Sequence, residues 1–88
     1  MPWRVRLEKR AEKDLSRIAA KDRERILRFL HDRVAPAEDP RDIGEALTGP
    51  LSGFWKYRVG DFRIICHIDD GQISILVVRI GNRREVYR

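Results

Sequence analysis

Cationic side chains alternate with apolar ones between Trp55 and Arg63, where Lys56 and Arg58 precede a Gly60-Asp61 pair. A Gly followed by Asp between two strand-like runs is typical of a two-residue hairpin loop. This loop would pair Arg58 with Arg63, and like charges directly opposed, with Cβ atoms about 5 Å apart, destabilise a sheet. A bound anion would remove that penalty, so the spacing predicts an anion-binding surface.

The same loop determines which side chains share a face of the hairpin, because side chains alternate sides along a strand. One face is predicted to belong to the core and holds Trp55, Tyr57, Val59, Phe62, Ile64 and Cys66. The opposite face holds Lys56, Arg58, Arg63, Ile65 and His67. Cys66 is the single cysteine of the chain, so we expect a buried, inert thiol and no internal disulfide.

The formal net charge of +5 indicates a polyanionic or acidic partner. Residues 1–53 carry 12 cations and 10 anions, which is the mixed pattern of solvated helix faces. Residues 54–88 carry seven cations and four anions. The basic excess therefore belongs to the predicted sheet.

Hydrophobic spacing predicts the elements that position this surface. Alternation indicates a first strand over residues 3–8, and helical spacing then gives two amphipathic stripes, from Ala11 to Ala19 and from Ile26 to Val34. Asp22 is expected to cap the second helix, which makes Lys21-Asp22 the corner of a helical hairpin. Each helix is too short to be stable alone, so both should pack on the sheet.

The second helix should end at Ala35-Pro36, and the segment to Gly53, rich in Pro, Gly and Asp, is expected to be a loop. Further strands are predicted at about 54–59, 62–68 and 73–80. The tail after Gly81-Asn82 is expected to add an edge strand or to lie across the sheet. Residues 1–88 should thus form a single α+β domain of β-α-α-β-β-β order, a helical hairpin packed on one face of a small, mainly antiparallel sheet.

No stretch of the sequence indicates export or insertion into a membrane. The N-terminal residues lack an apolar h-region, and the longest apolar run, residues 73–80, is short and interrupted by Ser74 and Arg79. His31 lies among charged residues, with nothing nearby to complete a metal site. We expect a cytoplasmic protein that uses no metal and no other cofactor.

In this order the motifs resemble those of the RelE/ParE superfamily, the toxins of bacterial type II toxin-antitoxin pairs. The resemblance spans nearly the whole chain, and its most specific parts are Leu47-Thr48-Gly49, residues 55–65, Val78, Gly81 and residues 83–87. It implies the RelE-like, microbial ribonuclease-type fold. It also implies a cognate antitoxin protein as a partner that holds the toxin inactive.

Two branches of this superfamily act differently. RelE-like members are endoribonucleases that cleave messenger RNA in the ribosomal A site, through attack of a ribose 2′-hydroxyl on the adjacent phosphate, and so inhibit translation. The resemblance places their catalytic set at Lys56, Arg58, Arg63, Arg83 and Tyr87, which favours this branch and a metal-independent enzyme. The alternatives are a ParE-like, non-enzymatic inhibitor of DNA gyrase and a degenerate toxin that only binds RNA or its antitoxin.

The residue types suit this chemistry. Arg63 and Arg83 are assigned to the phosphate, because fixed guanidinium groups stabilise charge on its non-bridging oxygens. Lys56 is a candidate general base or stabiliser of the attacking oxygen. Arg58 stands where well-known members have a second lysine, and we expect an electrostatic role because arginine is a poor base. Tyr87 would orient the 2′-hydroxyl, share in proton transfer or stack on a base.

The predicted RNA-binding surface consists of Lys56, Arg58, Arg63, Arg83, Arg84 and Phe54. We expect this cluster to be partly exposed, with Phe54 as an exposed aromatic and Trp55 packed in the core. His67 lies about 13 Å beyond Arg63 along the strand and is assigned a structural role. The plain alternative is a solvated sheet face whose charges merely prevent aggregation.

Overall fold

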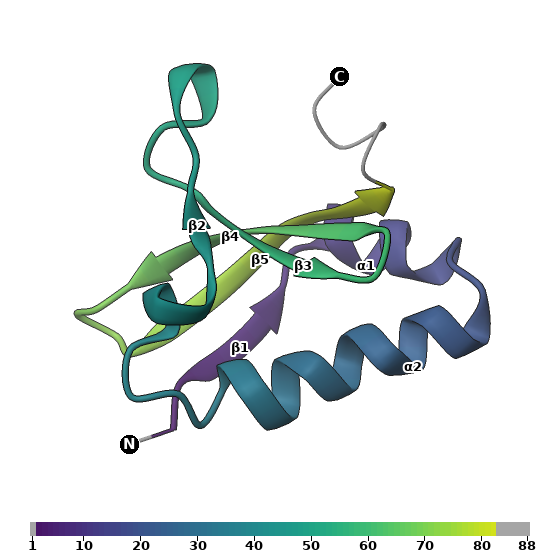
Figure 1. The fold of residues 1–88 in the computed structure, drawn as a ribbon, viewed down its shortest axis with the longest axis horizontal. Helices are drawn as coiled ribbons and strands as arrows, with labels where there is room; N and C mark the ends of the chain where they lie inside the picture. Colours follow the sequence, from purple (N-terminus) through teal and green to yellow (C-terminus); the bar gives the residue numbers. More distant parts are fainter. Residues whose placement is uncertain (1, 83–88) are drawn as a thin grey trace.

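The computed structural model describes residues 2–82 and shows two α-helices packed on a five-stranded sheet (Figure 1). The strands are β1 (Arg4–Leu7), β2 (Glu45–Ala46), β3 (Trp55–Val59), β4 (Phe62–Asp69) and β5 (Ser74–Asn82). The helices are α1 (Lys9–Ser16) and α2 (Ala20–Phe29), which lie between β1 and β2 in the chain. The predicted α+β class and the helical hairpin on one face of the sheet are confirmed. The predicted C-terminal tail lies outside the described residues.

The strand order in the sheet is β1-β5-β4-β3-β2. Strand β1 pairs in parallel with β5, whereas the pairs β2–β3, β3–β4 and β4–β5 are antiparallel. Strand β4 therefore lies at the centre of the sheet, and the predicted, mainly antiparallel character is confirmed.

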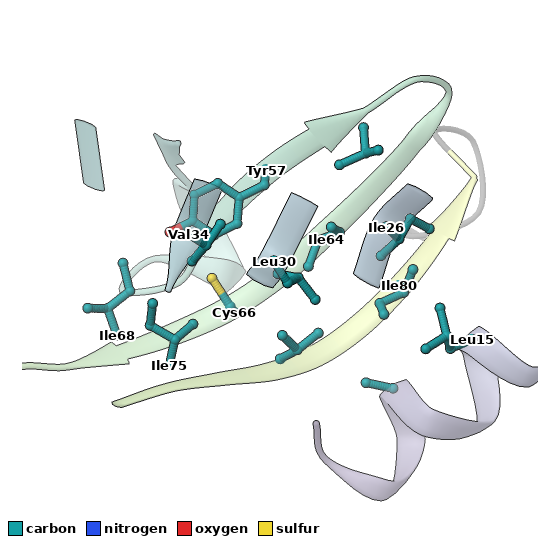
Figure 2. Packing of buried hydrophobic residues seen from close by; sticks show 13 residues of the cluster. Leu15, Ile26, Leu30, Val34, Tyr57, Ile64, Cys66, Ile68, Ile75 and Ile80 are labelled. Atoms are coloured by element: carbon teal, nitrogen blue, oxygen red, sulfur yellow. The ribbon is translucent and has the colours of Figure 1, made fainter. Parts of the chain in front are cut away.

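The core lies between the helices and one face of the sheet, as Figure 2 shows. Ile26, Leu30 and Val34 recur at every fourth residue, so they form one stripe and pack against the sheet. Cys66 is fully buried opposite them, and burial raises the pKa of its thiol to about 12. The thiol therefore stays protonated at neutral pH, and the expected burial of Cys66 is confirmed.

The corner of the helical hairpin lies earlier than predicted. Helix α1 ends at Ser16 and α2 begins at Ala20, so the corner is formed by residues 17–19 and the prediction of Lys21-Asp22 is wrong. Ile18 is partly buried against the core, and this packing fixes the corner. Asp22 is not the N-cap, which is Ala19; it lies in the first turn of α2, where the helix dipole also favours a carboxylate.

Helix α2 continues into one wider, π-helical turn, Leu30–Val34, in which the Ala35 N–H donates to the Leu30 carbonyl at 2.9 Å. The helix ends there, as predicted, because Pro36 has no N–H with which to continue it. Along residues 2–82, no helix combines the length and the apolar character that crossing a bilayer requires.

The segment predicted to be a loop contains short regular pieces. Two 3₁₀ turns, Pro40–Ile43 and Gly49–Leu51, flank β2, which pairs with the first two residues of β3. The Tyr57 hydroxyl donates to the Pro40 carbonyl at 2.8 Å and holds this segment against the core. The prediction of a loop was wrong at β2. This strand has only two residues and both are exposed, so the sequence shows no alternation of apolar and polar residues that would indicate a strand.

Candidate functional site

The Gly60-Asp61 turn gives the predicted register. The φ angle of Gly60 is 60°, a conformation that glycine adopts without strain and that a two-residue hairpin loop requires. Arg58 is paired with Arg63 across the hairpin. These arginines and Lys56 lie on the face of the sheet opposite the helices, which we call the basic face.

Arg63 is buried, with 4% of its surface exposed, so the expectation of a partly exposed cluster is wrong for this residue. The reason is its place in the central strand, where Arg58 of β3 and Gly81 of β5 flank it. Its Nε atom is buried without a hydrogen-bond partner, and within residues 2–82 no carboxylate pairs with its guanidinium group. A buried charged donor that lacks an acceptor costs free energy, and an oxyanion would supply that acceptor.

The two cations of β3 differ in their surroundings. Arg58 is exposed, as predicted. Lys56 is half-buried, and its Nζ lies 3.7 Å from Oε2 of Glu45, the residue opposite it on β2. The Glu45 side chain is 69% exposed, and ion pairs in such surroundings are weak, so a phosphate can compete with it for the lysine.

The aromatic residues near the basic face have distinct contacts. Phe54 is half-buried, and its ring meets that of His67 edge-on, with 6.0 Å between the centroids. Phe54 is thus less open than expected, whereas His67 is exposed and its structural role stays a prediction. Trp55 packs against the core as predicted, and the Arg41 guanidinium lies 5.8 Å from the centre of its ring.

The structure brings Lys56, Arg58 and Arg63 onto one face, while Arg83, Arg84 and Tyr87 lie outside the described residues and stay predictions. Gly81 near the end of β5 is paired with Arg63. The strand that leads towards position 83 is therefore hydrogen-bonded to the strand that carries Arg63.

Asp14 supports the end of β5, which sequence reasoning did not anticipate. Strand β1 pairs with β5 only up to Val77, and beyond that point Asp14 of α1 takes the place of a neighbouring strand. Its Oδ2 atom accepts hydrogen bonds from the Ile80 N–H and from Nε of Arg79, both at 3.0 Å. More than sixty residues separate these partners, so no local pattern in the sequence marks the contact.

The described part of the site can bind an anion and stabilise charge that develops on it. Three cations from two strands share one face, and the most buried of them lacks an acceptor at Nε. Within residues 2–82, no group of three or more His, Cys, Asp and Glu side chains is placed to hold a metal ion.

Known proteins are similar to this chain over nearly its whole length. The family model described as the ParE toxin of the type II toxin-antitoxin system, parDE, matches residues 5–87. Toxin RelG of Mycobacterium tuberculosis is 26% identical over 88 residues, which cover 100% of this chain and 99% of the relative. Toxin RelE of the same organism is 29% identical over 87 residues, which cover 99% of this chain and 88% of the relative.

A solved structure shares the fold. The crystal structure of the toxin-antitoxin complex RelBE2 from Mycobacterium tuberculosis superposes with a TM-score of 0.86, covering 97% of this chain and 95% of that one. The sequence identity is 24%, so this likeness concerns the architecture of two helices on a five-stranded sheet.

Proposed function

The chain belongs to the ParE toxin family of type II toxin-antitoxin systems, within the RelE/ParE superfamily, and from this we propose that it is a ribosome-dependent messenger-RNA endoribonuclease. Its relatives named RelG and RelE support the RelE-like branch. The single observation that carries the proposal is the buried guanidinium of Arg63, opposed by Arg58 and without an acceptor at Nε. A phosphate of bound RNA would satisfy that donor.

In the proposed reaction a ribose 2′-hydroxyl attacks the adjacent phosphorus, and the bond from phosphorus to the 5′-oxygen of the next nucleotide breaks. The products are a 2′,3′-cyclic phosphate and a 5′-hydroxyl, so one proton leaves the attacking oxygen and one joins the leaving oxygen. Because the substrate supplies the nucleophile, the reaction needs no activated water and no metal to generate one.

The side chains of the basic face have separate roles in this reaction. Arg63 holds the non-bridging oxygens and stabilises the charge that grows on them, as a buried, fixed donor does most effectively. Exposed Arg58 contributes a second positive charge from the opposite strand. Lys56 lies nearest the attacking oxygen, as a base or as a stabilising charge, while Arg83 and Tyr87 complete the phosphate contacts and the proton transfer.

The second candidate function is inhibition of DNA gyrase, favoured by the ParE name of the matching family model. Purified protein should be added to ribosomes that carry a defined message, and the 5′ ends of the RNA mapped. We expect cuts in phase with the codons that disappear in Arg63→Ala. Intact messages together with loss of gyrase supercoiling would instead establish the gyrase inhibitor.

The partner that controls this activity is a cognate antitoxin, as the family assignment and the toxin-antitoxin complex of similar fold indicate. We propose that an antitoxin segment with acidic and apolar residues covers part of the basic face. Apolar anchors would supply most of the affinity, and the charges would speed the encounter. Co-expression with the product of the adjacent small reading frame should relieve growth arrest.

A further inference from the structure

We propose that the chain holds RNA at a second place, in a cleft between α2 and β3 that lies beside the basic face. This cleft has a volume of about 350 Å³. Arg25, Arg28 and Arg33 line it from α2 and the turn that follows, and Arg58 lines it from β3. We call it the arginine cleft. The inference rests on the proposed RNA substrate but concerns a different set of side chains.

The three helical arginines reach the cleft from two segments. Arg25 and Arg28 are three positions apart and are therefore neighbours on the surface of α2, while Arg33 lies in the wider turn that follows it. On the other wall, a Cβ atom at Gly60 would lie 2.9 Å from Nη1 of Arg25. The missing side chain at Gly60 thus lets the Arg25 guanidinium lie directly against the hairpin turn.

The arginine cleft is positively charged. Its one lining carboxylate, Asp32, lies 2.8 Å from Nδ1 of His31, and Arg28 pairs with Glu24 at 2.9 Å. Within the described range 2–82, the guanidinium groups of Arg25, Arg33 and Arg58 make no ion pair or hydrogen bond. Like charges on residues that line one hollow repel one another, and a bound anion would reduce the repulsion.

The arginine cleft and the basic face meet at Arg58, on the part of the β3 edge that β2 leaves uncovered. A second hollow of about 330 Å³ shares Arg33 and Arg58 with it and extends to Lys56, and its lining also includes Asp42 and Glu45. Arg58 therefore borders both places. An RNA chain whose reactive phosphate lies at Arg63 can pass over Arg58 into the arginine cleft, where further phosphates meet Arg33 and Arg25.

The open edge of β3 argues against an added peptide strand as the occupant. Strand β2 pairs only with Trp55 and Lys56, which leaves residues 57–59 of this edge. In an antiparallel strand the backbone N–H and C=O groups of alternate residues point to the same side. Of residues 57–59, only Arg58 therefore points its N–H and C=O towards the open edge. An added strand would form one pair of backbone hydrogen bonds at this edge, whereas each guanidinium group can donate two hydrogen bonds to a phosphate.

The test compares two charge-matched variants. Arg25→Gln/Arg33→Gln removes two charges from the arginine cleft and leaves the predicted catalytic set intact. Arg6→Gln/Arg10→Gln removes two exposed charges from β1 and α1, outside the cleft lining. The probe is a fluorescent, 2′-O-methylated single-stranded RNA of mixed sequence, which lacks the attacking hydroxyl and stays intact. Binding is measured by anisotropy over a series of salt concentrations, after melting curves confirm that both variants fold.

We expect the cleft variant to bind about tenfold more weakly and to lower the slope of log affinity against log salt by about 1.4, which is two lost phosphate contacts. The control variant should change the slope by much less. Equal effects of the two variants would overturn the proposal, and so would unchanged RNA binding together with loss of binding to a glutamate-rich peptide. A parent protein that binds the probe through Arg25 and Arg33 but leaves messages intact would refute the cleavage reaction and support the cleft.

Discussion

Arg58 and Arg63 face each other across the β3–β4 hairpin on the same side of the sheet, the first exposed and the second buried. This arrangement disfavours the free protein, because opposed like charges destabilise a hairpin and a buried guanidinium without an acceptor at Nε loses solvation. The same features favour the state in which an anion is bound. Stability and function should therefore respond in opposite directions to changes at these positions.

Arg63→Met tests this opposition. The apolar side chain has a similar volume and removes the buried charge, so we expect the free energy of unfolding to rise by roughly 1 kcal/mol. RNA cleavage should fall by about 10²- to 10³-fold, as for the loss of one positioned oxyanion donor. Urea denaturation and message cleavage measure the two effects. A variant that is both less stable and fully active would contradict the assignment.

Arg83→Ala examines the predicted second phosphate contact. We expect a loss of about 2–4 kcal/mol of transition-state stabilisation, measured as a drop in cleavage rate at saturating ribosome concentration. Arg4→Ala, a change of an exposed arginine on β1, serves as the control for the lost charge. If the two variants cleave equally well, Arg83 lies outside the catalytic set.

Asp14→Ala should destabilise the fold. The change leaves the Ile80 N–H and Nε of Arg79 without their acceptor, at a cost of about 1–3 kcal/mol. Asp14→Asn keeps an oxygen for the Ile80 N–H and should lose about half as much. Glu12→Ala, an exposed change on the same helix, is the comparison in urea denaturation. No difference between Asp14→Ala and Glu12→Ala would show that the contact is not stabilising.

Alkaline pH should unfold the protein through its buried acids. Burial raises the pKa of the Cys66 thiol from 9.0 to about 12 and also raises that of the Tyr57 hydroxyl. The folded state keeps protons that the unfolded state gives up, so this stability is fully present below about pH 9 and is lost as the pH rises towards 12. Each group should contribute a slope of about 1.4 kcal/mol per pH unit. Cys66→Ala should flatten the fall, and an unchanged slope would refute the assignment to the thiol.

The register of the basic face could be predicted from the sequence because one local signal, the Gly60-Asp61 turn, fixes every pairing of the hairpin. The burial of Arg63 could not, since alternation assigns a side chain to a face and does not tell which part of that face is covered. The helical corner was misplaced because an acid in the first turn and a capping acid look alike in sequence. Asp14 and the arginine cleft escaped prediction because each joins elements that lie far apart in the chain.

Strands β1 and β5 pair with each other although they lie near opposite ends of the described residues, and this pairing limits how far the protein can fold during its synthesis. Residue 4 lies opposite residue 74, so β1 finds its place in the sheet only after nearly all described residues have left the ribosome. Strand β5 also provides one flank of Arg63. Strand pairs that are so far apart in the sequence form late in folding, because a long loop must close before their contacts can stabilise the fold. A nascent chain therefore carries the hairpin arginines well before it carries an assembled basic face.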